Sequence, residues 1–207
     1  ADDPHPFAGE DSQSVEQMKF SKTFKNILDK KVELDEDLDT FMKKLSKSAP
    51  HHSKIYGRTK TPFSILNKLV STRMLDEKKG LKDLVGTTVT FENVEDLKKF
   101  KNQAQKGLFG KVIDFDDYYQ NPKDGYRAYH FIIEQDGVPI ELQLKTLRMK
   151  DINVLSHDAY KNKRLNKDYM LFLTTLADHA DNGNKTAQNE FAQLMSKKSQ
   201  VEKQLNN

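Results

Sequence analysis

Apolar residues recur at helical spacing near the N-terminus of the 207-residue chain. Residues three and four apart share a helix face, so this spacing predicts helices over residues 15–32 and 35–45. Both apolar stripes are expected to form core. Residues 1–14 are rich in Asp, Pro, Gly and Ser and are expected to form a flexible arm. The apolar positions are Met18, Phe20, Phe24, Ile27 and Leu28, then Leu38, Phe41, Met42 and Leu45.

The middle of the chain alternates between β-rich runs and amphipathic helical runs. A dense turn signal, Asn-Pro-Lys-Asp-Gly, occupies residues 121–125. The pattern predicts a single α/β (α+β) domain over residues 15–207, in which helices flank a mixed sheet and residues 166–207 are helical. Strands are expected at residues 56–60, 87–91 and 111–118, and helices at residues 61–73, 94–105, 147–163, 168–181 and 186–204.

Two further strand-like runs meet at a Gln-Asp-Gly turn at residues 135–137. Side chains alternate between the faces of a strand, so residues two apart share a face. A face that combines ring, imidazole, carboxylate, amide and amine suits an active site that handles phosphate. An edge hairpin with one solvated face would show the same alternation. On the first strand, one face is expected to carry Tyr126, Ala128 and His130. On the second strand, one face is expected to carry Glu141, Gln143 and Lys145, and the opposite face Ile140, Leu142 and Leu144.

A second polar cluster lies upstream of this hairpin. Arg58 and Lys60 share a face of an extended segment. The Thr-Pro pair at residues 61–62 predicts a helix start, because proline suits the first helical position and threonine can cap it. Ser64 and Lys68 then lie four apart near the helix N-terminus, where backbone N–H groups and the dipole favour anions. The cluster suits a polyphosphate, although a solvated basic turn would have the same composition.

Composition narrows the classes of function. The net charge is +3 with basic and acidic residues interspersed, so charge alone does not indicate a nucleic-acid surface. The chain has no cysteine, which excludes a disulfide framework and a thiolate metal site. No run approaches the ~20 apolar residues of a membrane helix, so no membrane association is expected. The first residue is not Met, which fits either the mature end of an exported protein or an excised domain.

Short motifs follow one another along residues 50–165. They are R-x-K-x-x-x-S-x-x-x-K from Arg58, K-D-L-V-G around Asp83, G-Y-R-A-Y-H from Gly125, E-L-Q-L-K-T from Glu141 and H-D-A-Y-K from His157. In this order they resemble the synthetase domain of RelA/SpoT-type alarmone synthetases, as a small or toxin-like member. The resemblance implies the nucleotidyltransferase-like fold of that family, with a mixed, mainly antiparallel sheet. It also implies transfer of pyrophosphate from ATP to the ribose 3′-hydroxyl of a guanosine nucleotide.

The resemblance assigns a role to each matched residue. Glu141 is the expected catalytic base for the attacking hydroxyl, with Gln143 to orient that hydroxyl. Asp83 and Glu141 would hold one Mg²⁺, an ion that prefers oxygen ligands and binds substrate phosphates. The implied ATP-binding residues are Arg58, Lys60, Ser64 and Lys68. The implied acceptor-binding residues are Lys123, Tyr126, His130, Lys145 and Lys150, with His157 and Lys161 as supporting residues.

Some of these residues also have plainer explanations. Asp83 alone would be read as an N-cap or a salt-bridge partner. A lone histidine on a half-apolar strand, such as His130, is more often a core residue. His157 and Lys161 share a helix face and could simply brace the site.

Two positions depart from the family pattern. Thr88 stands where a second arginine usually stacks on adenine, which implies weaker or rearranged ATP binding. Lys150 stands where an Asn or Asp usually reads the acceptor guanine. An ammonium donates hydrogen bonds but cannot accept them, so we do not expect strict guanine selectivity, and Lys150→Asn should gain it. Products of the (p)ppGpp and the (p)ppApp type are therefore both expected.

The setting and the partners follow from this interpretation. We favour an exported enzyme, or a toxin delivered into a target cell. Because extracellular fluid supplies little ATP, the expected site of action is the cytoplasm of that cell. Purine nucleotides are the expected ligands. An immunity protein or a second copy of the chain is the expected partner. The tRNA 3′ end is a less favoured acceptor. A catalytically silent module that binds alarmones is the main alternative. The retained Asp83, Glu141 and Gln143 argue against it.

Overall fold

The computed structural model describes residues 11–71 and 84–207. Within them, one five-stranded sheet has the strand order β1-β2-β5-β4-β3. β2 and β5 are parallel and the other neighbouring pairs are antiparallel, which confirms the expected mixed, mainly antiparallel sheet. The strands are β1 (Lys54–Thr59), β2 (Val85–Phe91), β3 (Lys111–Asp117), β4 (Tyr129–Gln135) and β5 (Val138–Thr146).

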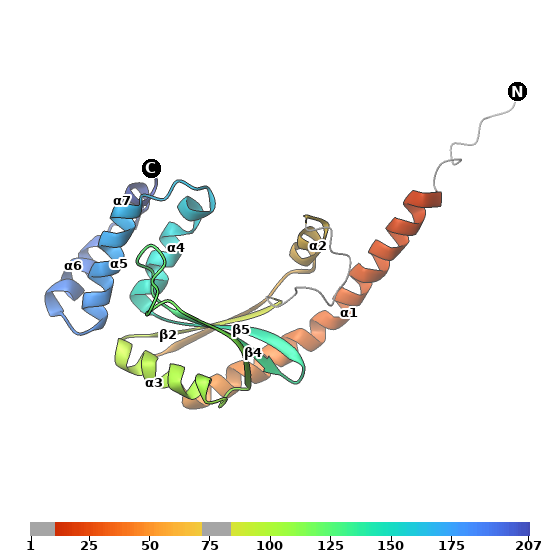
Figure 1. Ribbon diagram of the computed structural model, residues 1–207, viewed down its shortest axis with the longest axis horizontal. Coiled ribbons are helices and arrows are strands. Elements are labelled where there is room, and N and C mark those ends of the chain that lie inside the picture. The colour runs from red at the N-terminus through yellow and green to blue at the C-terminus, as the bar shows by residue number, and fades with distance from the viewer. Residues whose placement is uncertain (1–10, 72–83) are drawn as a thin grey trace, which may run out of the picture.

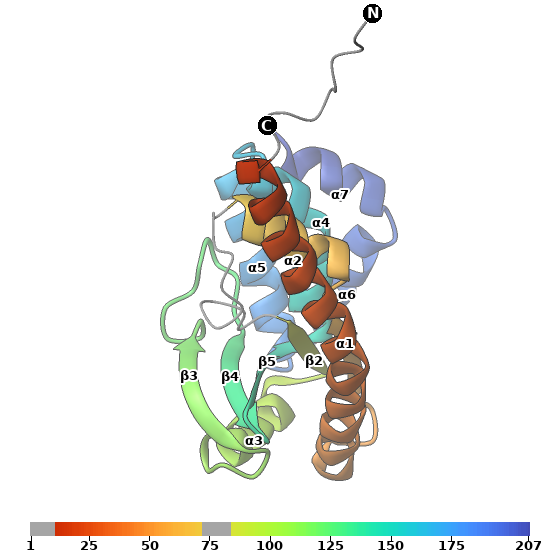
Figure 2. The same ribbon diagram turned by 90° about the vertical axis from the view of Figure 1, so that its right-hand side faces the viewer.

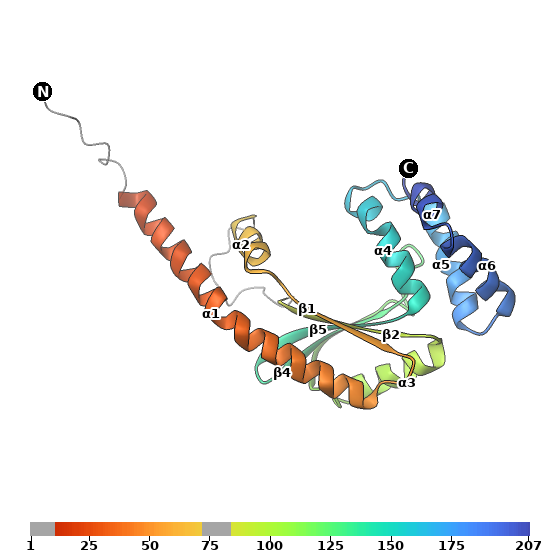
Figure 3. The same ribbon diagram turned by 180° about the vertical axis from the view of Figure 1, so that it is seen from behind.

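Helices cover both faces of the sheet (Figure 1). α3 and the C-terminal half of α1 lie against one face, while α2 and α4 rise from the other (Figure 3). α5, α6 and α7 pack with α4 away from the sheet. Figure 2 shows β3 at one edge of the sheet and α1 near the opposite edge. The helices are α1 (Asp11–Ser48), α2 (Pro62–Ser71), α3 (Val94–Gln105), α4 (Leu147–Lys161), α5 (Lys167–Asp181), α6 (Lys185–Met195) and α7 (Lys198–Leu205).

The apolar face of the predicted hairpin forms the main core. Ile140, Leu142 and Leu144 of β5 are fully buried, as the alternation predicted. They pack with aromatic and aliphatic side chains of α1, α3 and β4. Because successive side chains of a strand alternate, burial of this face turns the polar residues of β5 toward α4. The helix and strand partners include Phe41, Leu45, Leu97, Phe100, Phe131 and Ile133.

The N-terminal helix α1 is one 38-residue helix, not the two helices expected at residues 15–32 and 35–45. Lys31 and Asp35 form an ion pair of 3.6 Å across the expected break, at the helical i, i+4 spacing. No glycine or proline interrupts the segment. The helix begins at Asp11, so the last four residues of the expected arm (11–14) are helical, and residues 1–10 lie outside the described chain.

The segment expected as one helix, residues 186–204, forms two helices, α6 and α7. The backbone N–H of Lys197 donates to the Leu194 carbonyl at 3.0 Å, a three-residue step that tightens the last turn of α6. α7 then begins, and it buries Val201 and Leu205 in a second core shared by α4–α7. Within residues 11–71 and 84–207, no helix has the length and apolarity needed to cross a membrane.

Tyr126 is predicted to lie in the first strand of the hairpin, but β4 begins only at Tyr129. Gly125, with a φ of +86°, turns the chain just before Tyr126. A Cβ at this glycine would meet Thr174 Oγ1 at 2.0 Å, so no other residue fits. Lys123 and Tyr126 exchange backbone hydrogen bonds of 3.1 and 2.9 Å, which close this turn. Tyr126 therefore lies in a tight turn at the entrance of β4.

Candidate active site

Strand register lines up polar residues across the face of the sheet on whose side α2 and α4 lie. Tyr56 of β1 pairs with Thr88 of β2, which pairs with Gln143 of β5. Gln143 pairs in turn with His130 of β4. These positions form one row across the sheet. The neighbouring row consists of Arg58, Gly86 and Glu141.

Two pockets lie on this face. The first, which we name the sheet pocket, has a volume of about 310 Å³ and is lined by β1, β2, β5 and α4. The second, the tyrosine pocket, has a volume of about 160 Å³ and is lined by α4, β4 and the chain between β3 and β4. Asn153 lines both, so the pockets adjoin. The sheet pocket includes Tyr56, Arg58, Thr88, Glu141, Gln143, Lys145 and Lys150, and the tyrosine pocket includes Tyr118, Lys123, Tyr126, His130, His157 and Tyr160.

A chain of hydrogen bonds joins the polar side chains of β5. Lys145 Nζ donates to Gln143 Oε1 at 2.7 Å, and Gln143 Nε2 donates to Glu141 Oε1 at 2.5 Å. Because Gln143 accepts from an ammonium on one side and donates to a carboxylate on the other, its amide orientation is set. The sheet therefore holds Glu141 and Gln143 in one fixed relation, as the spacing of two residues predicted.

Lys145 connects the two pockets. Its side chain is buried, and its ammonium lies 5.3 Å from the centroid of the Tyr126 ring. Burial lowers the pKa of Lys145 to about 8, which the charge of Glu141 partly offsets and the charge of Lys150 reinforces. A cation in this position faces a carboxylate in the sheet pocket and an aromatic ring in the tyrosine pocket.

Tyr126 and His130 meet in the tyrosine pocket. The Tyr126 hydroxyl lies 3.5 Å from His130 Nε2, and the Tyr118 ring packs edge-on against the imidazole at 4.9 Å. Burial, and then the charge of Lys145, lowers the pKa of His130 to about 4. The imidazole is therefore neutral near pH 7 and can accept a hydrogen bond from the Tyr126 hydroxyl.

Of the remaining residues implied for the acceptor and support roles, Lys123 and His157 line the tyrosine pocket and Lys161 does not. Lys123 Nζ lies 4.8 Å from the centroid of the Tyr160 ring, at the tyrosine pocket. A hydrogen bond with Tyr160 raises the pKa of Lys123, so its charge persists. His157 lines the same pocket. Lys161, in the last turn of α4, is exposed and lines neither pocket.

The upstream basic cluster folds as a strand followed by a helix, as predicted. Thr61 caps α2, because its Oγ1 accepts from the Ser64 N–H at 3.1 Å, and it donates to Ser64 Oγ at 2.8 Å. Arg58 lines the sheet pocket, while Lys60 and Ser64 lie at the junction of β1 and α2. Asp83 and the side chain of Lys68 lie outside the described residues.

Of the residues implied for the acceptor, Lys145 and Lys150 line the sheet pocket, whereas Lys123, Tyr126 and His130 line the tyrosine pocket. The Lys150 ammonium lies 3.2 Å from the centroid of the Tyr56 ring, a cation–π contact that reaches from α4 to β1. Lys150 lines the sheet pocket together with Arg58 and Thr88, and not the tyrosine pocket with Tyr126. Lys150 therefore shares its pocket with Arg58, the residue implied for adenine.

Several lining residues had no role in the sequence interpretation, among them Tyr56, Tyr118 and Asn153. Tyr56 was detectable, since it lies two residues before Arg58 on the same strand face. Asn153 follows Lys150 by three residues, which places both on one face of a helix. Tyr118 reaches the pocket only because the chain turns back after β3, and no local pattern signals this.

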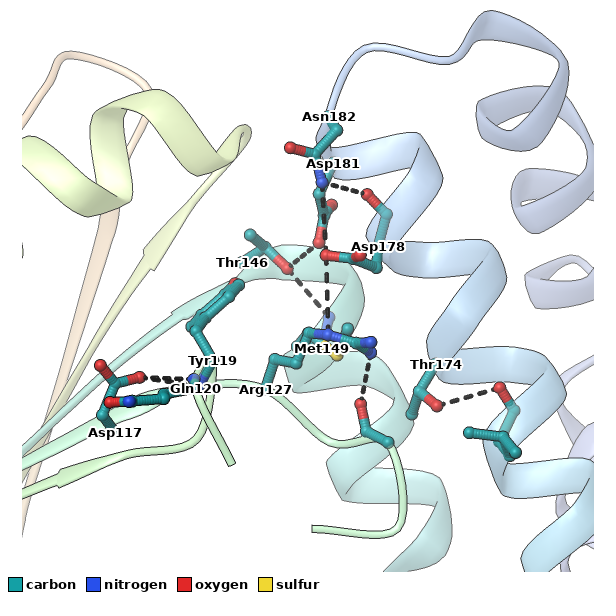
Figure 4. A network of polar contacts seen from close by, with 12 residues as sticks. Asp117, Tyr119, Gln120, Arg127, Thr146, Met149, Thr174, Asp178, Asp181 and Asn182 are labelled. Carbon is teal, nitrogen blue, oxygen red and sulfur yellow. Dashed lines mark hydrogen bonds and ion pairs between the residues drawn. The ribbon is translucent and has the colours of Figure 1, made fainter. Parts of the chain in front are cut away.

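A buried carboxylate fixes the start of α4 against α5 (Figure 4). Thr146 caps α4 by accepting from the Met149 N–H at 3.2 Å, and it donates to Asp181 Oδ2 at 2.6 Å. Arg148 Nη1 donates to the other oxygen of Asp181 at 3.0 Å. Burial raises the pKa of Asp181 to about 6, although both hydrogen bonds favour the ionised form. This network sets the direction of the helix that carries Lys150 and Asn153.

Comparisons with known proteins agree with this architecture. Residues 57–165, more than half of the chain, match the family described as a region found in RelA / SpoT proteins. Comparison with curated proteins finds no match. The fold and the polar face of the sheet therefore define an α/β protein of the RelA/SpoT class, and the family match shows that the chain belongs to the RelA/SpoT family.

Several solved structures are similar. Small alarmone synthetase 1 from Bacillus subtilis, bound to its product pppGpp, is 23% identical over 81% of this chain and 99% of its own, with a TM-score of 0.62. Small alarmone synthetase 2 from the same organism is 26% identical over 76% and 90%, with a TM-score of 0.55. A GTP pyrophosphokinase family protein from Streptococcus pneumoniae is 22% identical over 90% and 96%, with a TM-score of 0.54. They share the fold predicted from the motifs.

Proposed function

We propose that this chain transfers pyrophosphate from ATP to the ribose 3′-hydroxyl of a purine nucleotide. The observation that carries the proposal is the hydrogen-bonded chain Lys145–Gln143–Glu141 beside two adjoining pockets on a RelA/SpoT sheet. We assign ATP to the sheet pocket, which Arg58 lines near the start of α2. The acceptor is assigned to the tyrosine pocket, where Tyr126 offers a ring for stacking and Lys123 a charge for phosphate.

The chemistry follows from these positions. The 3′-oxygen forms a bond to the β-phosphorus of ATP, the bond from that phosphorus to the oxygen shared with the α-phosphate breaks, and AMP leaves. Glu141 takes the proton of the hydroxyl as a general base. Gln143 orients Glu141, and the cationic Lys145 and Arg58 compensate phosphate charge. Positioning and charge compensation dominate catalysis of this kind of transfer.

Mg²⁺ fits the described residues as a companion of ATP. Glu141 presents a carboxylate to the sheet pocket, and Mg²⁺ commonly takes one or two carboxylates plus substrate phosphates. Within the described residues, no group of three His, Asp or Glu side chains gathers as a metal site, which is compatible with such sparse coordination. Asp83, the second implied ligand, lies outside them. When bound, the ion would neutralise charge on the transferred phosphates.

The acceptor is proposed to be either purine nucleotide, with products of the (p)ppGpp and (p)ppApp type. Stacking on Tyr126 tolerates both bases, and Lys150 lies in the other pocket. The test incubates the protein with γ-labelled ATP, Mg²⁺ and one candidate at a time: GDP, GTP, ADP, ATP, AMP or tRNA. Label on guanosine and adenosine nucleotides is expected. Label on tRNA alone would change the acceptor class, and no label on any candidate would leave a nucleotide-binding module without activity.

A further inference from the structure

Asn153 occupies a central place between the two pockets. It lies in α4, it is half-buried, and it is the described residue that lines both the sheet pocket and the tyrosine pocket. Among the residues that the structure describes, no group forms a hydrogen bond with its carboxamide. The side chain thus presents both a donor and an acceptor to the pockets.

The surroundings of Asn153 separate it from Lys150, one helical turn earlier. Lys150 extends toward Tyr56 of β1 and lines only the sheet pocket. Asn153 shares the tyrosine pocket with Tyr126, the ring on which an acceptor base would stack. Asn153 is therefore the carboxamide of α4 that shares a pocket with Tyr126.

We propose that Asn153 pairs with the polar edge of the acceptor base and sets its selectivity. This inference rests on the proposed function, because it concerns the acceptor of that reaction. Guanine presents an acceptor at O6 beside a donor at N1, and adenine presents a donor at N6 beside an acceptor at N1. A carboxamide can match either pattern by rotating half a turn about its last bond.

The selectivity for guanine or adenine then depends on whether other groups fix the orientation of the Asn153 amide. Gln143 is fixed between Lys145 and Glu141, whereas Asn153 has no such partners among the described residues. A carboxamide that can rotate accepts both purines. Strong discrimination needs polar groups that are fixed in one pattern, so the wild-type site is base-tolerant through Asn153.

A carboxylate at position 153 would remove this tolerance of both purines, because it has no donor to present. Asn153→Asp accepts two hydrogen bonds, which suits the N1–H and exocyclic amine of guanine but opposes the N1 lone pair of adenine. We expect the ratio of kcat/KM for GDP over ADP to rise at least about tenfold, since an unmatched buried polar pair costs roughly that factor. Asn153→Ala should lower kcat/KM for both acceptors by about three- to tenfold without changing their ratio.

The experiment measures kcat/KM for GDP and ADP at fixed ATP for the wild type and both variants. Asn189→Asp is the matched control, because Asn189 is exposed on α6 and lines neither pocket. Thermal unfolding verifies that each variant is folded. An unchanged GDP/ADP ratio in Asn153→Asp, with both acceptors unaffected in Asn153→Ala, would overturn the role of Asn153.

Equilibrium binding distinguishes this inference from the proposed function. Calorimetric titration of GDP and ADP, with a non-hydrolysable ATP analogue present, requires no turnover. If the wild type transfers nothing but Asn153→Asp still shifts binding toward GDP, the proposed reaction fails and the role of Asn153 stands. If transfer proceeds but neither binding nor turnover changes in the variants, the role of Asn153 fails alone. Absence of purine binding by the wild type would overturn both.

Discussion

The ammonium of Lys150 lies 3.2 Å from the centroid of the Tyr56 ring, in a pocket that Arg58 and Thr88 also line. Tyr56 pairs in register with Thr88, the position where the family usually has a second arginine for adenine. The chain thus places a cation and an aromatic ring beside the position that lacks the arginine. Both groups can contact a purine face.

Lys150→Ala is expected to raise the KM for ATP and to change the KM for the acceptor much less. Loss of a cation–π and charge contribution of about 0.5–2 kcal/mol corresponds to roughly two- to thirtyfold. Initial rates at varied ATP and at varied GDP provide the measurement. Lys185→Ala, at an exposed position on α6, is the matched control. A Lys150→Asn variant that gains guanine preference with an unchanged KM for ATP would instead return Lys150 to the acceptor base, as the sequence suggested.

Glu141→Gln should abolish transfer while ATP still binds. The amide cannot take the hydroxyl proton, and general-base catalysis contributes about 10²- to 10⁴-fold. Turnover with labelled ATP and calorimetric binding of an ATP analogue separate the two effects. Glu134→Gln is the control, because Glu134 is an exposed carboxylate on β4 that lines neither pocket. Near-normal turnover of Glu141→Gln would remove this carboxylate from the mechanism.

Lys60→Ala and Lys68→Ala should chiefly weaken the response to ATP. A charge-assisted contact to phosphate contributes about 1.5–3 kcal/mol, or roughly ten- to a hundredfold in KM. Rates at varied ATP with saturating acceptor measure the effect, and Lys198→Ala on α7 serves as the control. If neither variant alters the KM or the rate, the basic cluster is a solvated surface.

Asp181 should make stability fall as pH rises from about 4 to 6. Burial raises its pKa from 3.8 to about 6 in the folded protein, so the folded state binds this proton more tightly than the unfolded state. The stabilisation of the folded state by this bound proton is fully present below about pH 4 and is lost above about pH 6. A pKa shift of this size corresponds to about 3 kcal/mol in the free energy of unfolding.

Urea unfolding of the wild type and of Asp181→Asn between pH 4 and pH 7 measures this contribution. The difference in free energy of unfolding, wild type minus variant, should decrease over this interval. Asp158→Asn, an exposed position on α4, is the control for loss of a carboxylate as such. A difference for Asp181→Asn that rises with pH would show that its partners Thr146 and Arg148 outweigh burial.

The alternation along β5 could be predicted from the sequence because it depends only on strand geometry. Ile140, Leu142 and Leu144 face the core, and Glu141 and Gln143 face α4, since a strand has no other way to separate them. Thr61 was also predictable as a cap, because the interaction spans three residues. The ends of two helices could not be predicted in this way. α1 continues through residues 33–34, where the apolar stripe pattern indicated a break. α6 ends near Met195, although the residues that follow it are compatible with a helix.

The sequence by itself therefore determined the approximate positions of the strands, the family and the polar side of β5, because each depends on local spacing or on a motif. The tertiary structure alone decided which pocket each residue of α4 serves. Lys150 reaches Tyr56 and Asn153 lies between both pockets only because the Asp181 network fixes α4 over the sheet. Such contacts join residues far apart in the chain, and no local period encodes the distance between them.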